Sequence, residues 1–393
     1  MASIVLSASV RQNLLSLQST ADLLSTTQSR LATGKKVNSA LDNPTNFFTA
    51  ASLENRASDI NNLLDGIGNG VQVLQAANTG ITSLQKLVDT AKSIAQQVLQ
   101  APVGYSTKAS QTSLANAGGT AANLLGGALA QADVLTIAAT GGGTATSITF
   151  GTGAAEVDTL TELNAALAAN NLQASVNDTT GAITITTTND AASANIGAFG
   201  GTATAGVKAF STLTTVAKVA DATSQLTRST LVAQYNNIIA QITTTAQDAS
   251  FNGINLLNGD NLKLTFNENG KSTLNISGVT YNATGLGLAS LVGGTDFLDS
   301  GSANKVISAL GSASNSLRSQ ASSLGSNLSI VQIRQDFSKN LINVLQTGSS
   351  NLTLADTNEE AANSQALSTR QSIAVSALAL ANQSQQSVLQ LLR

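Results

Sequence analysis

Both ends of this chain carry apolar residues at alternating steps of three and four. Within residues 3–31 only Gln28 interrupts the row, and residues 358–392 repeat the same spacing. Such spacing is typical of a coiled-coil seam, in which each helix buries one stripe against another helix. Two segments far apart in the sequence are therefore expected to pair in space. The principal predicted seam residues are Val10, Leu14, Leu17, Leu24, Leu31, Leu367, Leu378, Val388 and Leu392.

Longer periodic runs lie between the two ends, at residues 45–100, 222–249 and 302–346. The first and third would form helices roughly 70–80 Å long at about 1.5 Å per residue. Rods of this length cannot bury an apolar stripe alone and must pack against one another. The predicted packing positions recur at sevens: Ile60, Ile67, Leu74, Ile81, Leu310, Leu317, Leu324 and Val331.

Residues 102–221 break the periodicity and are rich in Gly, Ala and Thr. Strands are predicted at 134–138 and 146–150, a helix at 158–169, and a hairpin from 172–176 and 182–188. This pattern indicates a small α+β domain inserted between helices. A second hairpin is predicted at 262–281, turning at residues 267–270.

The predicted fold class is mostly α, with long antiparallel coiled-coil helices built from both chain ends, a small inserted α+β domain and a β-hairpin between helices. Three domains are expected. Residues 1–44 and 350–393 form an inner terminal coiled coil with its connecting segments. Residues 45–101 and 222–349 form an outer helical rod that carries the hairpin at 262–281. Residues 102–221 form a surface-exposed insertion.

The composition excludes several classes of protein. The 393 residues contain no Cys, no His and no Trp, so zinc fingers, haem ligands, disulfides and Cys–His nucleophiles are excluded. The formal net charge of −3 argues against binding to nucleic acid, which depends on clustered Lys and Arg. No apolar run approaches the roughly 20 residues of a membrane helix, and no standard secretory signal is recognised. We expect no cofactor and no metal.

The motifs that could carry chemistry are weak. Ser83 and Lys86 match S-x-x-K of penicillin-binding enzymes, but the companion motifs are absent and the pair lies on a heptad helix. Gly66, Gly68 and Gly70 do not fit a nucleotide loop and are interpreted as sites of close helix–helix approach. No enzymatic activity is predicted.

Clustered carboxylates are the remaining possibility for an ion site. The pairs Glu156/Asp158 and Glu359/Glu360 could offer oxygen ligands to Ca²⁺, but neither has the spacing of an EF-hand loop. Solvated charge is the preferred interpretation of both pairs.

Specific phrases in the terminal regions point to a family. Residues 1–85, the tail at 358–393 and the phrase FNGINLL at 251–257 resemble bacterial flagellins. Residues 30–40, RLATGKKVNSA, are similar to the family element RLSSGxRINSA. Residues 42–48, DNPTNFF, depart from the common DDAAGxAI form and are closer to the alphaproteobacterial branch. The segment 133–190 is similar to β-rich modules in the variable region of flagellins and hook proteins.

The resemblance implies a fold and a function. In flagellins the terminal helices pair into an inner coiled-coil tube, longer helices form the outer core, and the variable insert projects outward. The subunits leave the cell unfolded through type III flagellar export and polymerise into the extracellular motility filament. The implied partners are further copies of the chain, the filament cap, the hook-junction proteins and an export chaperone on the C-terminal helix. No nucleic acid and no membrane are implied.

The assembly mechanism expected from these features is physical. A subunit with apolar seams at both ends cannot cover them alone, and heterologous contacts that do not close into a ring produce a helical filament. Two alternatives stay open: a hook–filament junction protein, or a secreted adhesin or effector with its activity in residues 102–221. The phrase at 251–257 and the long amino-terminal similarity favour the filament subunit.

One family feature transfers poorly. Many flagellins carry a helix motif, LQRxRELxxQ, that animal innate receptors recognise, and residues 84–93 here read LQKLVDTAKS. The matching positions are Gln85, Lys86, Asp89 and Thr90. Lys86 stands where the motif has Arg and cannot reproduce a bidentate Arg contact. Weak or absent receptor activation is predicted.

Overall fold

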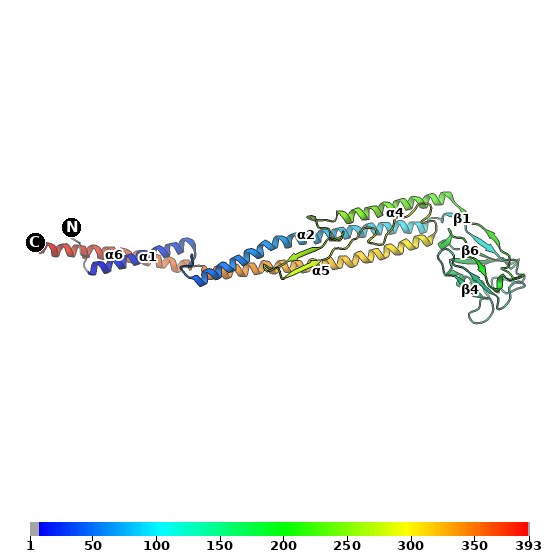
Figure 1. The fold of residues 1–393 in the computed structure, drawn as a ribbon, viewed down its shortest axis with the longest axis horizontal. Coiled ribbons are helices and arrows are strands. Elements are labelled where there is room, and N and C mark those ends of the chain that lie inside the picture. Colours follow the sequence, from blue (N-terminus) through cyan, green and yellow to red (C-terminus); the bar gives the residue numbers. More distant parts are fainter. Residues whose placement is uncertain (1–7, 392–393) are drawn as a thin grey trace. The chain divides into compact units, whose positions relative to one another are not determined.

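The computed structural model describes residues 8–391, and five long or medium helices dominate it (Figure 1). The predicted mostly helical fold class is confirmed. These helices are α1 (Ala8–Thr33), α2 (Pro44–Gln100), α4 (Ala222–Asp248), α5 (Ser300–Thr353) and α6 (Thr357–Leu391).

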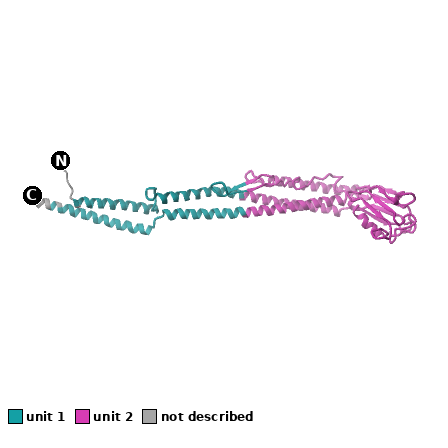
Figure 2. Cartoon of the chain, turned by 60° about the horizontal axis from the view of Figure 1, so that its bottom comes forward, with its two compact units in different colours: residues 1–70, 263–274, 330–393 teal, residues 71–262, 275–329 magenta. Residues whose placement is uncertain are grey.

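The contacts divide the chain into two compact units (Figure 2). The first unit comprises residues 1–70, 263–274 and 330–393, and the second comprises residues 71–262 and 275–329. Since α2 and α5 both run through the border between the units, the three-domain division expected from the sequence stays a prediction.

The first unit holds the paired helices α1 and α6, residues 44–70 of α2, residues 330–353 of α5, and residues 263–274. A small apolar cluster joins the α2 and α5 segments, with Leu53, Leu64 and Leu341 packed around it; its buried members are Ala57, Ile60, Ile342 and Leu345. Every one of these positions follows the helical period, which is why the two segments present matching stripes.

In the second unit α4 lies alongside parts of α2 and α5 (Figure 1). The buried face of α4 recurs at steps of three and four and carries Val232, Tyr235, Ile239, Ile242 and Ala246. Asp221 caps the helix by accepting a hydrogen bond from the Thr223 N–H at 3.2 Å. This cap and apolar stripe explain why the helix begins where it does.

The insertion contains two small sheets around one core. A four-stranded sheet has the order β5-β6-β2-β8, and a three-stranded sheet has the order β4-β3-β7. The strands are β2 (Ser110–Thr112), β3 (Val134–Ile137), β4 (Thr146–Thr149), β5 (Leu172–Val176), β6 (Ile183–Thr187), β7 (Phe199–Gly200) and β8 (Thr214–Val216). Both sheets are antiparallel throughout.

Helix α3 (Leu160–Ala168) contributes Leu163 and Leu167 to the core of the insertion. A capping box sets its start, because Thr159 accepts from the Glu162 N–H while Glu162 accepts from the Thr159 N–H. Phe150 and Phe210 stack in the same core with ring centroids 6.2 Å apart.

The chain enters and leaves the insertion through one antiparallel pair, β1 (Tyr105–Thr107) and β9 (Val219–Ala220). Tyr105 faces Ala220 across the pair. Gly104 extends the connection, since its N–H donates to Leu298 O at 3.0 Å and its carbonyl accepts from the Asp221 N–H at 3.0 Å.

The second hairpin is formed by β10 (Leu262–Thr265) and β11 (Thr273–Ile276). Its second strand is shorter than predicted, because the chain turns away after Ile276 and continues as irregular backbone. The turn is closed by a hydrogen bond from the Phe266 N–H to Ser272 O at 2.8 Å and by the Asn267 side chain, which accepts from the Ser272 N–H.

The interpretation of the glycines in α2 as sites of helix–helix approach is wrong within the chain. A Cβ built on Gly66 or Gly68 would meet nothing within 4 Å. A Cβ on Gly70 would lie 2.4 Å from Leu264 Cδ2, which belongs to the β-hairpin and not to a helix. Of these three glycines, only Gly70 is therefore required by packing, and its partner is a strand side chain.

Candidate functional site

The two ends of the chain pair through α1 and α6, which lie side by side in both views (Figures 1 and 2). Their connecting segments also meet. The Lys36 N–H donates to Thr353 O at 2.7 Å, and the Ala355 N–H donates to Gly34 O at 2.9 Å. These bonds place the end of α1 at the beginning of α6, so the two helices are antiparallel.

Each helix turns one row of less exposed side chains toward its partner. On α1 this row consists of Val10, Asn13, Leu17, Thr20, Leu24, Thr27 and Arg30, and on α6 of Glu360, Ser364, Leu367, Gln371, Ala374, Leu378 and Ala381. The predicted antiparallel pairing of the chain ends is present. The row is more polar than predicted, because Asn and Thr occupy several of its positions.

The predicted seam residues divide into three groups. Val10 is 3% exposed, and the leucines at 17, 24, 367 and 378 are half-buried. Leu14 and Leu31 are 38% and 40% exposed, so α6 of the same chain does not cover them, and their part in packing between subunits stays a prediction. Leu14 is displaced because Asn13 takes the inner position of that helical turn. The Val388 side chain and Leu392 lie outside the described residues.

Several large apolar side chains of α1 and α6 have no cover in the single chain. Leu15 and Leu23 on α1 are 66% and 53% exposed. On α6, Ile373 is 64% exposed, Val375 52% and Leu380 72%. These exposed apolar side chains are available for contacts with another protein surface. The pair thus has apolar surface on its outside as well as between its helices.

The segment that joins α1 to α2 is ordered by one carboxylate. Asp42 accepts hydrogen bonds from the N–H groups of Asn38 and Ser39 at 3.0 and 2.9 Å, and from the Ser39 hydroxyl at 3.1 Å. The backbone hydrogen bond from Ser39 is the main reason that the pKa of Asp42 lies below its usual value. Gly34 has φ of 68°, a conformation that glycine adopts without strain, and it ends α1.

The predicted outer packing positions are all buried. Ile60 and Ile67 are 2% and 1% exposed, and the other six are at most 1% exposed: Leu74, Ile81, Leu310, Leu317, Leu324 and Val331. The heptad pattern therefore identified side chains that the helices bury.

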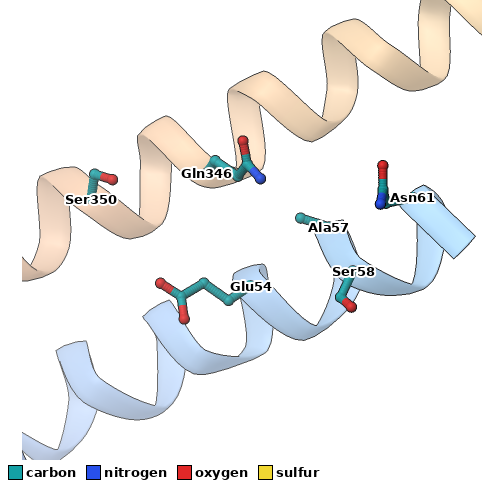
Figure 3. Close-up of a pocket in the computed structure, with 6 residues that line it drawn as sticks. All are labelled: Glu54, Ala57, Ser58, Asn61, Gln346 and Ser350. Atoms are coloured by element: carbon teal, nitrogen blue, oxygen red, sulfur yellow. The ribbon is translucent and has the colours of Figure 1, made fainter.

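A polar groove of about 600 Å³ lies between α2 and α5 in the first unit (Figure 3). Small side chains leave space between the two helices: Ala57 and Ser58 line the groove from α2, and Ser350 lines it from α5. Glu54 accepts a hydrogen bond from Ser349 Oγ at 2.9 Å. The groove's lining of Glu, Ser, Asn and Gln side chains offers hydrogen-bonding groups.

The weak motifs do not assemble into reactive sites. Ser83 donates its hydroxyl to Thr79 O at 3.1 Å, one turn back on α2, as helix serines commonly do. Glu156 accepts from the Gly153 N–H in a local turn. Glu360 pairs with Arg30. Among residues 8–391, no three carboxylate, His or Cys side chains gather into a group that could hold a metal ion.

The residues that match the innate-receptor motif lie on α2. Lys86, Asp89 and Thr90 are exposed, and Gln85 is half-buried. The Thr90 hydroxyl donates to Lys86 O at 2.8 Å. The predicted weakness of receptor activation stays a prediction.

Two charged groups of structural importance were not predicted from the sequence. Arg30 Nη1 lies 3.3 Å from Glu360 Oε1. Arg228, which is 0% exposed, donates to backbone carbonyls of Val98, Ala101 and Pro102 at 3.0, 2.8 and 2.6 Å, and also to Phe297 O. Burial lowers the pKa of Arg228, and the charge of Asp299 opposes that effect.

Within the described part of the chain, no helix combines the length and apolar character needed to cross a lipid bilayer.

Comparison with known proteins gives consistent matches at both ends. The profile of the bacterial flagellin N-terminal helical region matches residues 5–117, and that of the bacterial flagellin C-terminal helical region matches residues 307–392. Together these matches span about half of the chain.

Individual relatives come from alphaproteobacteria. Flagellin FljM of Caulobacter vibrioides is 32% identical over 164 residues, which cover 42% of this chain and 59% of FljM. A flagellin of Brucella melitensis is 30% identical over 173 residues, which cover 41% of this chain and 60% of that flagellin. Flagellin A of Rhizobium meliloti is 34% identical over 124 residues, which cover 32% of this chain and 27% of that flagellin. The chain thus spans about 59% of the length of the Caulobacter relative.

The two profile matches fall on the segments that supply the paired ends, α1 and α6, on the whole of α2 and on most of α5. The predicted resemblance is confirmed: the chain belongs to the bacterial flagellin family.

Proposed function

We propose that this chain is the structural subunit of an extracellular bacterial flagellar filament and that it works by polymerisation. Its membership of the flagellin family supports this role. The single observation that carries it is the antiparallel pair of α1 and α6, which leaves large apolar side chains on its outer surface. A lone subunit cannot cover them, and packing among copies can.

The assembly step follows from the same surface. Removing apolar area from water stabilises a contact by about 25 cal/mol per Å². Ordering and immobilising the subunits opposes this gain, so assembly is expected to need an existing filament end as template. Contacts between different faces of identical subunits give a helical polymer when their rotation does not close into a ring.

The further partners and the route of export belong to the same proposal. We expect unfolded export by the flagellar type III apparatus, a chaperone that holds the C-terminal helix, and a filament cap and hook-junction proteins at the two ends of the polymer. The absence of Cys suits a chain that leaves the cell. We expect no catalytic activity.

Seeded elongation tests the proposal. Purified chain added to sheared filament fragments should extend them into micrometre filaments visible by electron microscopy. A chain lacking residues 359–393 should stay monomeric and soluble, because it loses nearly all of α6. Filaments from the truncated chain, or no elongation by the full chain, would refute the proposal.

The same assay separates the two alternatives. A hook–filament junction protein would bind the fragment ends without elongating them. A secreted adhesin or effector with its activity in residues 102–221 would neither bind the fragments nor elongate them.

A further inference from the structure

A small pocket in the first unit combines positive charge with an apolar floor. It has a volume of about 210 Å³ and is lined by residues of α2, α5 and the turn of the β10–β11 hairpin. Ile60 and Ser338, 2% exposed each, lie at its base, and Phe266 is 9% exposed. The turn that closes it is held by its own hydrogen bonds, so the pocket is formed before anything binds.

Two arginines line this pocket, and they differ in their partners. Arg56 Nε lies 2.9 Å from Glu268 Oε1, so its charge is compensated. The Arg334 guanidinium lies over the Phe266 ring, 5.8 Å from the centroid. Among the described residues no carboxylate lies within ion-pair distance of Arg334. The pocket therefore has one uncompensated positive charge beside an aromatic wall.

The pocket opens onto an exposed apolar stripe of α5. Ile330, Ile333 and Val344 are 45%, 68% and 66% exposed, and Phe337, at 57%, belongs to both the stripe and the pocket. At 100° per residue these side chains and Arg334 lie on one face of the helix. We call this surface, residues 330–344 with Arg334 at its edge, the α5 stripe. A small anion would fill the pocket and leave the stripe uncovered.

A complementary surface lies on α2 of the same unit. Asp59, Asn62, Asp65 and Gly66 are exposed and share the side of the helix turned away from the buried Ile60. Neither carboxylate takes part in an ion pair or hydrogen bond among the described residues. Gly66 has nothing within 4 Å of a built Cβ, so the helix surface next to Asp65 is open. We call this the α2 acidic face.

We propose that the α5 stripe of one copy docks on the α2 acidic face of a second copy, with an aspartate of the second copy entering the pocket toward Arg334. This inference rests on the proposed filament and names a contact within it. Three observations choose the occupant: opposite uncompensated charges, an apolar stripe that extends well beyond the pocket, and an acidic face on which Gly66 leaves the helix surface open. The two faces differ, so the contact is heterologous, the type of contact from which a helical filament can be built.

Charge reversal tests the contact in seeded elongation. Arg334→Glu should raise the critical concentration for elongation at least tenfold, because it sets like charges against each other. Two double variants, Arg334→Glu/Asp59→Lys and Arg334→Glu/Asp65→Lys, test the partner. One of the two should regain most of the lost elongation. Lys339→Glu is the matched control: it makes the same charge change on the opposite side of α5 and should leave elongation unchanged.

Folding must be separated from docking. Arg334 is exposed and takes part in no ion pair among the described residues, so the Arg334→Glu monomer should keep the wild-type circular dichroism and thermal unfolding. Normal elongation by Arg334→Glu, or no recovery in either double variant, would overturn the inference while leaving the proposed filament intact.

A cross-linking arm keeps the test informative even without filaments. The natural chain has no Cys, so engineered cysteines react without background. A size-tagged Ile333→Cys chain mixed with an untagged Asn62→Cys chain at high concentration should give a mixed disulfide dimer, and Lys339→Cys with Asn62→Cys should not. A mixed dimer without elongation would refute only the filament proposal, and no mixed dimer would refute the contact.

Discussion

Arg30 near the end of α1 and Glu360 near the beginning of α6 form an ion pair, with 3.3 Å between Nη1 and Oε1. The side chain of Glu360 is 11% exposed and that of Arg30 is 35% exposed. The pair lies next to the backbone bonds between residues 34–36 and 353–355. The ion pair therefore stabilises the junction at which α1 ends and α6 begins.

Reversing one of these charges should loosen the beginning of α6. Arg30→Glu sets two carboxylates against each other, and partly exposed pairs of this kind contribute up to about 1 kcal/mol. Hydrogen exchange of residues 357–364 should become several times faster. The swapped variant Arg30→Glu/Glu360→Arg should return most of the protection; equal exchange in the single and double variants would show that the pair is not coupled.

Arg228 should contribute more to the stability of the fold than any exposed arginine does. Its guanidinium satisfies carbonyls at the end of α2 from a fully buried position, so Arg228→Met leaves those acceptors without donors. Each buried carbonyl left without a donor costs about 1–3 kcal/mol, so we expect a loss of about 3–5 kcal/mol in the free energy of unfolding, measured by chemical denaturation. Arg318→Met, at an exposed position of α5, should change it by less than about 0.5 kcal/mol. Similar losses in the two variants would contradict this assignment.

Replacing two glycines of α2 by alanine should change the stability of the chain in opposite directions. A Cβ on Gly80 would lie 2.6 Å from Ala249 Cβ and 2.7 Å from Leu257 Cδ1. The first of these atoms cannot rotate away, so Gly80→Ala should destabilise the chain by about 1–3 kcal/mol. Gly68→Ala meets nothing within 4 Å and should stabilise it by about 0.5–1 kcal/mol. Thermal unfolding of the monomers measures both; a change of the same sign would refute the comparison.

Tyr235 should make the stability depend on pH in alkaline solution. It is 1% exposed, and burial raises the pKa of its hydroxyl from 10.0 to about 12. Between those values the unfolded chain has lost the proton and the folded chain keeps it. The free energy of unfolding should therefore fall by about 1.4 kcal/mol per pH unit in this window.

The matched variant for this window is Tyr235→Phe. Denaturation at pH 9 and pH 11 should show a smaller decrease for Tyr235→Phe than for the natural chain, because the remaining alkaline titrations are common to both. An equal decrease would show that Tyr235 does not titrate differently in the folded state.

The helices were predictable because their apolar residues are periodic. The runs at 45–100 and 222–249 match α2 and α4 within a residue or two. α5 continues to Thr353, beyond the predicted end at 346. Its last turns have little apolar periodicity and instead bury polar groups, such as Ser349 at 1% exposure with its hydroxyl on Glu54.

The site was predictable in outline and not in detail. Periodicity identifies Leu17 and Leu24 but cannot show that Thr20 and Thr27 occupy inner positions, because it counts only apolar side chains. The Arg30–Glu360 pair joins residues 330 positions apart, beyond the reach of any local pattern. Short strands such as β2 are defined by partners elsewhere in the chain, as Gln111 is by Ile185 and Thr215.

The pairing of β1 with β9 has a consequence for how this chain can vary. Because Tyr105 and Ala220 face each other, the two ends of the segment between them lie side by side. The rest of the second unit therefore sees this segment as it would see a short turn between two adjacent strands. The stretch also contacts the beginning of α5, where Ser193 donates to Asp299 and Asn304 donates to Asp190. Evolution or an experimenter could therefore change its length or exchange it as a unit, provided that the paired strands and this contact are kept.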